Sequence, residues 1–192
     1  MLTVLFGYLA GSVPFAFLLA RRAGVDVRIA GSGNVGAANV LRTTSTGRAA
    51  VVMALDVAKG VLAVALAHFA NAGSAMTAAT GAAAILGHVY PVWLRFHGGK
   101  GVAVAAGVFA MLTPPAALLA CGVFIVITRA TRYVSLGSLA AAIALPPAAW
   151  LTGAPPPFVL TAVGTAGLIV FSHRANIQRL LAGTERRMGV PA

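Results

Sequence analysis

Long apolar segments recur from one end of this chain to the other, and they limit what it can fold into more than any other feature. They lie at about 2–20, 49–70, 74–92, 101–113, 115–128, 134–151 and 156–172. Hydrophobic residues account for 59% of the 192 residues and charged residues for 9%, which is not the composition of a soluble domain. Because a helix needs roughly 20 apolar residues to cross a bilayer, the sequence predicts an all-α integral membrane protein. We expect a compact bundle of about seven transmembrane helices that forms a single domain over residues 1–192.

Positive charges lie in alternate loops of this predicted bundle. Arginines occupy the loops after the first, third, fifth and seventh segments, whereas Asn71–Ser74, Thr113–Pro115 and Thr152–Pro157 carry no basic residue. Since basic loops remain on the cytoplasmic side, the pattern predicts seven crossings with the N-terminus outside and the C-terminus in the cytoplasm. A five-span arrangement places at least one basic loop on the wrong side. The fourth and fifth segments are short and meet at Pro114-Pro115, which leaves a hairpin open as an alternative to two crossings.

The same loops explain the net charge of +11. No groove-binding motif or interleaved aromatic residue accompanies the arginines, so we expect no nucleic-acid partner. Arg21 and Arg22 follow the first apolar segment rather than precede it, which predicts a retained span and not a cleaved signal peptide. Cys121 stands alone in an apolar segment and is predicted to be a small buried residue.

Gly31–Arg42, with the sequence GSGNVGAANVLR, is a polar and glycine-rich stretch in an otherwise apolar chain. It matches G-x-G-x-x-G, and Asp56 follows Gly36 by twenty residues, but the strand that a dinucleotide-binding motif requires is missing. A plain glycine-rich turn between two spans remains open. An anion cradle explains the density of donors better. Its candidate residues are Gly31, Ser32, Gly33, Asn34, Asn39 and Arg42.

A second glycine-rich segment surrounds Lys100, which is bracketed by Gly98, Gly99 and Gly101. An apolar helical run begins directly after it, so backbone amides at a helix N-terminus and a cationic side chain coincide, as in a phosphate-binding loop. The segment is not a Walker A motif, because no Ser or Thr follows the lysine. A basic turn that contacts anionic lipid headgroups remains the alternative. His88 is expected to cap or brace this loop.

The remaining polar candidates lie farther along the chain or inside a span. His173 and Asn176 are three residues apart, so they share a helical face, and Ser138 lies near the start of the sixth apolar segment. Asp56 and Lys59 are also three apart, within the second segment. A structural ion pair is favoured for them over a direct chemical role, because intramembrane charges are costly unless paired. We interpret Arg179 as part of a plain interfacial helix.

Four polar segments fall on the predicted cytoplasmic side, and they predict one composite site there. They are 28–48, 93–101, 129–138 and 173–187. With three acidic residues in the whole chain, a metal-dependent phosphotransferase is hard to build. We therefore expect no metal and no cofactor.

Five motifs, in chain order, resemble the bacterial acyl-phosphate:glycerol-3-phosphate acyltransferases of the PlsY family. They are GSVPFAFLLAR at 11–21, GSGNVGAANVLR at 31–42, DVAKG at 56–60, GHVYPVWLRFHGGKGVA at 87–103 and HRANIQRLLAGTE at 173–185. Ala16 and Ala38 are slight departures from the family pattern. The resemblance implies site residues at Ser32, Asn39, Arg42, Gly98–Lys100, Ser138, His173 and Asn176.

The resemblance implies acyl transfer from acyl phosphate to the 1-hydroxyl of sn-glycerol 3-phosphate, at the cytoplasmic face of a bacterial inner membrane. The product is lysophosphatidic acid, an intermediate of phospholipid synthesis, and no protein partner can be inferred. Both substrates carry phosphate, so Arg42 and Lys100 are natural clamps. We expect direct attack without an acyl-enzyme, with Asn176 donating to the oxyanion. His173 is either a base or a positioning residue, with substrate phosphate taking the proton. The alternative from another class is an anion or lipid transporter, but no inverted repeat is found.

Overall fold

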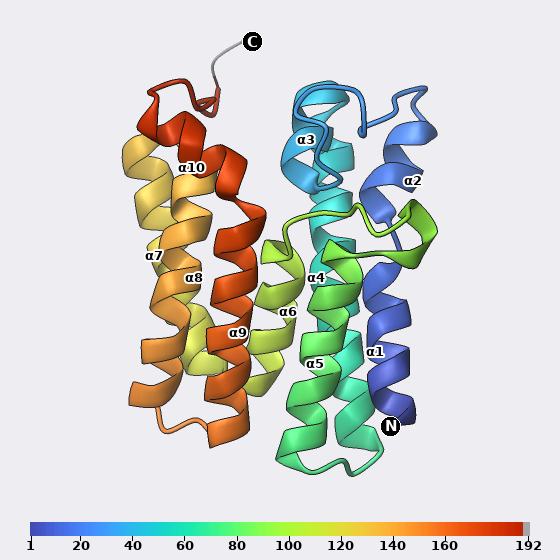
Figure 1. Ribbon diagram of the computed structural model, residues 1–192, viewed down its shortest axis with the longest axis vertical. Coiled ribbons are helices and arrows are strands. Elements are labelled where there is room, and N and C mark those ends of the chain that lie inside the picture. Colours follow the sequence, from blue (N-terminus) through green and yellow to red (C-terminus); the bar gives the residue numbers. More distant parts are fainter. Residues whose placement is uncertain (190–192) are drawn as a thin grey trace. The chain divides into compact units, whose positions relative to one another are not determined.

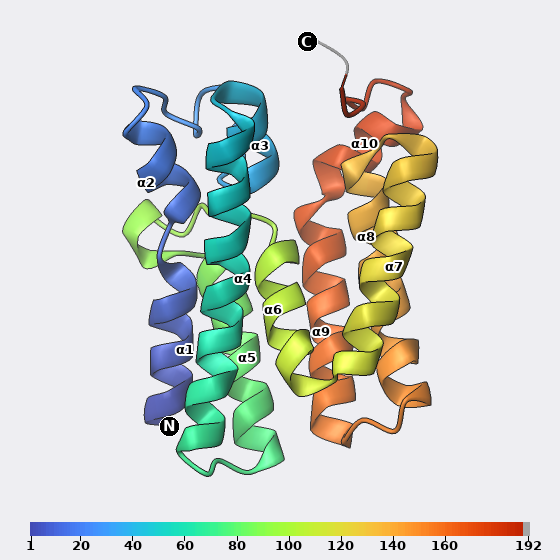
Figure 2. The same ribbon diagram turned by 180° about the vertical axis from the view of Figure 1, so that it is seen from behind.

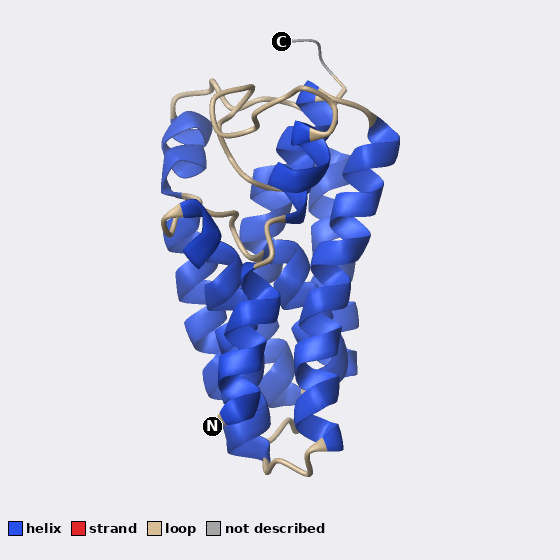
Figure 3. Ribbon diagram, turned by 90° about the vertical axis from the view of Figure 1, so that its right-hand side faces the viewer, coloured by secondary structure: helices blue, strands red, loops and turns tan. Residues whose placement is uncertain are grey.

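The computed structural model describes residues 1–189, and every regular element in that range is a helix (Figure 3). Contacts between Cα atoms divide the chain into two compact units, Met1–Met111 and Leu112–Ala192. The all-helical prediction is therefore confirmed for the described part of the chain.

In the first unit the helices α1, α4 and α5 run side by side (Figure 1). Of its two long connections, residues 22–36 lie at the end of the unit away from the N-terminus and residues 90–101 lie nearer its middle (Figure 1). The elements are α1 (Leu2–Ser12), α2 (Phe15–Arg21), α3 (Ala37–Thr43), α4 (Thr46–Phe69), α5 (Ser74–Val89), the 3₁₀ turn η1 (Val92–Leu94) and α6 (Val102–Leu112), whose last residue passes the boundary of the unit.

The first apolar segment is one span that is broken in the middle. Val13 is extended, with ψ 117°, and Pro14 precedes the first residue of α2. Proline lacks an N–H and disfavours a helical residue before it, so α1 ends at Ser12 and α2 begins afresh at Phe15. The break brings backbone polar groups into the interior of the unit, where the site described below uses one of them.

Glycines set the close approach of the helices in the first unit. A Cβ added at Gly11 would overlap the Ala84 carbonyl of α5, and one at Gly87 would overlap the Tyr8 carbonyl of α1. In the same way, Gly60 of α4 lies against the backbone of α6. Small residues allow helix backbones to approach closely in membranes, so these positions bring α5 and α6, and the loop between them, close to α1 and α4.

The second unit contains three helices side by side and one short helix that turns away from them. They are α7 (Pro114–Thr131), α8 (Val134–Leu151), α9 (Pro156–Ser172) and α10 (Arg174–Leu181). The axis of α10 is bent from that of α9 by 59°, and α10 lies at the same end of this unit as the α7–α8 connection (Figure 1). Figure 2 gives the reverse view, with α7 in front of α8 and α9.

Within residues 1–189, four segments are long and apolar enough to cross a membrane by length and composition, and the count is five if the bent pair of α9 and α10 is one span. They are Leu2–Arg21, Thr46–Phe69, Pro114–Thr131 and Val134–Leu151. The predicted third and fourth crossings are the shorter helices α5 and α6, of 16 and 11 residues.

The short helix α3 was not predicted, since its stretch was interpreted as a loop. The prediction for Cys121 was wrong. Cys121 is exposed on α7, along with Leu118 and Ile125.

Candidate functional site

Asn39 organises the first polar segment, Gly31–Arg42, from inside. Its Oδ1 accepts a hydrogen bond from the Ser32 backbone N–H at 2.8 Å, and its Nδ2 donates to the Val27 and Ala30 carbonyls at 2.9 and 3.0 Å. The residue is fully buried. Gly31 has φ +63° and lies so close to Asn39 Oδ1 that an added Cβ would overlap it. The segment therefore has a defined conformation that depends on a glycine and on one buried amide.

An apolar cluster holds this segment against the rest of the unit. Val27, Val35 and Val40 are buried together with residues of α2 and α4 and with Leu94. By contrast, Ser32 and Arg42 are exposed and Asn34 is partly exposed. The packing thus buries the valines and leaves Ser32, Asn34 and Arg42 toward the surface. Asn39, which was also predicted to face an anion, is instead buried and bonded within the segment.

An ion pair lies at the start of the connection to this segment. The Asp26 carboxylate accepts hydrogen bonds from the Arg28 side-chain Nε at 2.9 Å and from its backbone N–H at 3.0 Å. These bonds lower the pKa of Asp26 to about 2 and raise the pKa of Arg28. The Arg28 guanidinium also lies over the Phe17 ring, 4.7 Å from its centroid, which is a favourable cation–π distance. Sequence reasoning did not identify this pair.

The glycine loop, Gly98–Gly101, is bonded to the C-terminal end of α5. The Gly98 N–H donates to the Val89 carbonyl and the Gly99 N–H to the His88 carbonyl, each at 3.1 Å. Lys100 follows and is partly buried. The amides of Gly98 and Gly99, which were predicted to bind an anion, are therefore already used by α5. His88 thus braces the loop, as predicted.

The two glycine-rich segments meet within the first unit. A Cβ on Gly99 would overlap His88 Nε2 and would lie 2.7 Å from the Val35 carbonyl oxygen. Only a residue without a side chain fits between α5 and the first polar segment at this point. The backbone at Arg95 and Phe96, just before the loop, is left-handed, with φ 51° and 63°.

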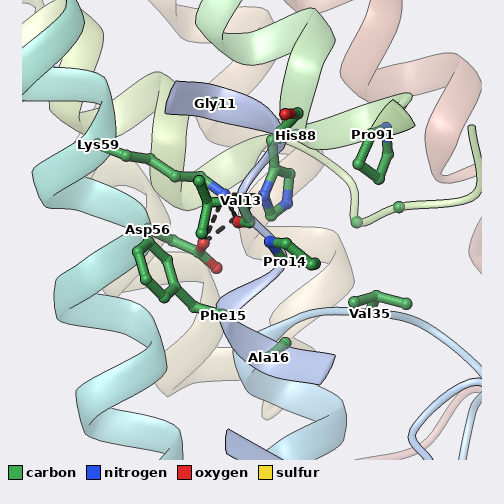
Figure 4. Close-up of a pocket in the computed structure, with 13 residues that line it drawn as sticks. Gly11, Val13, Pro14, Phe15, Ala16, Val35, Asp56, Lys59, His88 and Pro91 are labelled. Carbon is green, nitrogen blue, oxygen red and sulfur yellow. Dashed lines mark hydrogen bonds and ion pairs between the residues drawn. The ribbon is translucent and has the colours of Figure 1, made fainter. Parts of the chain in front are cut away.

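Asp56, Lys59 and His88 form a buried polar cluster beside the glycine loop (Figure 4). Lys59 Nζ lies 2.9 Å from Asp56 Oδ1 and 3.0 Å from both His88 Nδ1 and the Val13 carbonyl oxygen. The predicted pairing of Asp56 with Lys59 is confirmed. A small pocket at the break of the first span is lined by this cluster, by residues 11–16 and by Val35, Pro91, Gly98 and Gly99.

In the second unit, His173 ends α9 and Asn176 lies in the first turn of α10, and both are buried. The His173 Nδ1 is 2.8 Å from the Ile169 carbonyl oxygen. Since a carbonyl only accepts, Nδ1 carries the proton and Nε2 is the basic nitrogen of the ring. Ser138 is buried in α8 and donates to the Val134 carbonyl at 2.9 Å.

Glu185 holds Asn176 in place. Its Oε1 accepts from Asn176 Nδ2 at 2.7 Å and from Ser135 Oγ at 2.8 Å, and its Oε2 accepts from Arg179 Nε at 2.7 Å. Burial by itself raises the pKa of Glu185, but the hydrogen bonds from Asn176, Arg179 and Ser135 outweigh it and hold the pKa below its ordinary value. Arg179 is therefore more than part of an interfacial helix.

Glu185 lies within one of the sequence motifs, but the sequence did not predict a role for it. An available signal was the scarcity of acids, because a carboxylate in a chain of net charge +11 seldom lacks a basic partner. Ser135 was visible only as a hydroxyl near Ser138. Among residues 1–189, no group of three or more His, Cys, Asp or Glu side chains is placed to hold a metal ion.

The family model described as glycerol-3-phosphate acyltransferase matches residues 1–183. The chain belongs to this acyltransferase family. Relatives named glycerol-3-phosphate acyltransferase from Rubrobacter xylanophilus and Nitrobacter winogradskyi are 46% and 48% identical to it over 189 residues. The alignments cover 98% and 97% of this chain and 95% of each relative.

Two solved structures of PlsY, described as an integral membrane glycerol 3-phosphate acyltransferase, are similar to this chain. The glycerol 3-phosphate form has a TM-score of 0.94 at 41% identity, and the lysophosphatidic acid form has 0.92 at 40%. Each match covers 98% of this chain and 94% of the solved chain. The family member described here is accordingly a multi-pass integral membrane enzyme, a glycerol-3-phosphate acyltransferase.

Proposed function

We propose that this enzyme transfers a fatty acyl group from acyl phosphate to the 1-hydroxyl of sn-glycerol 3-phosphate. The products are 1-acylglycerol 3-phosphate, that is lysophosphatidic acid, and inorganic phosphate. The observation that carries the proposal is the match, over nearly the whole chain, to a solved relative in its glycerol 3-phosphate form. The same relative in its lysophosphatidic acid form supports the product.

The phosphate-binding role belongs to the polar residues of the first unit. Arg42 and Lys100 supply positive charge, and Ser32, Gly31, Gly33, Asn34 and the start of α6 after Gly101 supply neutral donors. Charge-assisted hydrogen bonds to phosphate are stronger than neutral ones. Asn39 positions this segment from inside, since its amide bonds to Ser32, Val27 and Ala30.

The chemical step is a direct transfer. The substrate hydroxyl oxygen attacks the acyl carbonyl carbon, the bond from that carbon to the phosphate oxygen breaks, and phosphate leaves with the electron pair. The hydroxyl proton passes to His173 Nε2 or to the departing phosphate. Asn176, which Glu185 holds in place, donates to the oxyanion, and Ser138 assists in substrate binding.

We place the reaction at the cytoplasmic face of the bacterial inner membrane, with seven crossings, the N-terminus outside and the C-terminus inside. The alternation of basic and uncharged loops supports this orientation. The family match over residues 1–183 supports a single acyltransferase domain. The acyl chain remains in the bilayer, which accounts for an apolar helical enzyme with polar loops.

The test is an assay of the purified protein with acyl phosphate and glycerol 3-phosphate, without added metal. We expect lysophosphatidic acid and phosphate in equal amounts. If acyl phosphate is not consumed while acyl-coenzyme A supports the reaction, the proposed donor is wrong. If neither donor yields an acylated product, the proposed reaction is wrong.

A second assay tests direct transfer. The protein is incubated with labelled acyl phosphate alone, denatured rapidly and analysed by mass spectrometry of the intact chain. We expect no covalent acyl adduct. An adduct that forms and is then discharged by glycerol 3-phosphate requires an acyl-enzyme instead.

A further inference from the structure

We propose that Lys59, together with Asp56 and His88, is a positioning residue that sets the glycine loop for substrate phosphate. None of the three is among the residues to which the proposed reaction gives a role. The inference rests on the proposed function, because the loop that it positions is the one assigned to phosphate binding. It concerns how that loop is held, and Lys59 is not expected to touch substrate.

The Lys59 ammonium lies against three polar atoms inside the first unit. Its Nζ donates to the Val13 carbonyl oxygen at 3.0 Å and lies 3.0 Å from His88 Nδ1. It also forms an ion pair with Asp56 Oδ1 at 2.9 Å, a contact that lacks hydrogen-bond geometry. Lys59 is 5% exposed and Asp56 is 2% exposed. The Lys59 ammonium therefore links α4 both to the break of the first span and to α5 (Figure 4).

The contact with Lys59 also determines which ring nitrogen of His88 carries the proton. An ammonium only donates, so His88 Nδ1 accepts, the ring proton is on Nε2 and the imidazole is neutral. The Nε2 edge is the one that fills the space beside Gly99, where an added Cβ would overlap it. Since the His88 carbonyl also accepts from the Gly99 N–H, His88 connects Lys59 to the glycine loop through its ring and its backbone.

Burying the Asp56–Lys59 ion pair removes two charges from water, and this free-energy cost argues for a role beyond stability. A buried ion pair is weak evidence for stability, because well-packed apolar residues of similar size are often as stable or more so. Here the three charged or polar groups lie at the one place where the broken span, α5 and the glycine loop come together. An apolar replacement would fill the space but would not fix the direction of the His88 ring or the Val13 carbonyl.

The experiment measures kcat and the KM of both substrates for matched variants. The main variant is Asp56→Asn with Lys59→Met, which removes both charges and leaves no unpaired ion. We expect it to raise the KM of the same substrate that Lys100→Ala affects by about tenfold, the size of one hydrogen bond to a charged group, while kcat changes less than about threefold. Thr80→Val is the control, because Thr80 is buried in the same helix as His88 but bonds to Thr3 and Met76.

Combining these variants with Lys100→Ala distinguishes a positioning role from a general loss of structure. In the Lys100→Ala background, the Asp56→Asn/Lys59→Met change should add little to KM, because the effects of residues that act through one loop are not additive. An unchanged KM in the double variant, or full additivity with Lys100→Ala, overturns the proposal. Wild-type protein that makes no lysophosphatidic acid overturns the proposed function instead.

A second pair of variants decides the question if the first does not fold. His88→Asn keeps an acceptor near the position of Nδ1, whereas His88→Leu removes it. We expect His88→Asn to keep the KM closer to the wild-type value than His88→Leu does. Equal KM values for the two variants overturn the role of the Lys59–His88 hydrogen bond.

Discussion

Each acidic residue of this chain has a basic partner close to it. Asp26 bonds to Arg28, Asp56 pairs with Lys59 at 2.9 Å, and Glu185 bonds to Arg179 at 2.7 Å. Since these are the three acids of the sequence, the carboxylates neutralise neighbouring cations locally and the net positive charge remains in the polar loops. Such loops attract anionic substrates and anionic lipid headgroups alike.

Lys100→Ala is the direct test of the phosphate-binding role at the level of one residue. We expect the KM of one phosphate substrate to rise by about tenfold or more, because a charge-assisted hydrogen bond is lost. Lys100→Arg should retain part of the affinity, since the charge remains. Arg22→Ala is the control, because Arg22 is exposed and lies outside the proposed site. Steady-state kinetics on both substrates give the answer, and KM values like those of the wild type would remove Lys100 from this role.

Glu185 predicts a pH dependence of stability. Its folded pKa lies below the ordinary value of 4.5, so its stabilisation is fully present above that value and is lost as the pH falls through the folded pKa. We expect Glu185→Gln to lower the Tm of detergent-solubilised protein at pH 7, because hydrogen bonds to a charged group stabilise by about 2 kcal/mol each.

The difference in Tm between wild type and Glu185→Gln should shrink as the pH is lowered below 4.5, the ordinary value of the pKa. The comparison is a thermal melt of both proteins at several pH values. A difference that is independent of pH would mean that the carboxylate charge does not matter. Thr184→Val, at an exposed neighbouring residue, is the control.

At the scale of helices, the apolar pattern predicted most of the fold and missed its interruptions. The segments at 49–70, 134–151 and 156–172 closely match α4, α8 and α9, because a continuous apolar run in lipid has no stable alternative to a helix. The break at Val13 was missed, although Pro14 marks it, because the run around it is uniformly apolar. The helix α3 was missed because its stabilisation comes from packing of Val40 and from Asn39, which are tertiary contacts.

The site shows the same division between local pattern and tertiary contact. The sequence marked Asn39 and Asn176 as candidates by their motifs, but nothing local shows that Asn39 bonds to Val27 or Asn176 to Glu185. Those contacts join residues that are nine or twelve positions apart and depend on the loop conformation. The pair of Asp56 and Lys59 was predictable, because its partners lie on one face of one helix.

Glycine contacts between helices give opposite predictions for two similar substitutions. Gly11→Ala places a methyl group against the Ala84 carbonyl of α5, so we expect a clear fall in Tm, since overpacking costs about 1–3 kcal/mol. Gly122→Ala in α7 meets nothing within 4 Å, so it should be neutral or stabilising by up to about 1 kcal/mol. Thermal melts in the same detergent compare them. Equal effects of the two substitutions would show that the α1–α5 approach does not depend on Gly11.

At the scale of the whole molecule, the number of crossings depends on α5 and α6. A 16-residue helix such as α5 is about 24 Å long, shorter than the roughly 30 Å of hydrocarbon in a typical bilayer. The alternation of basic loops nevertheless predicts that α5 crosses, because Asn71–Ser74 carries no basic residue whereas Arg95 and Lys100 follow the helix. Local thinning of the bilayer or continuation of the span by the loop accommodates such a helix.

Cysteine labelling in whole cells tests this topology. The exposed Cys121 is first replaced by Ala, and single cysteines are then introduced at Ser74, His97 and Ala182, which are all exposed. We expect a membrane-impermeant maleimide to label Ser74→Cys in intact cells, and to label His97→Cys and Ala182→Cys only after permeabilisation. Labelling of His97→Cys together with Ser74→Cys would mean that α5 does not cross. It would leave the glycine loop on the side away from a cytoplasmic substrate, and the proposed phosphate-binding role of Lys100 would then be untenable.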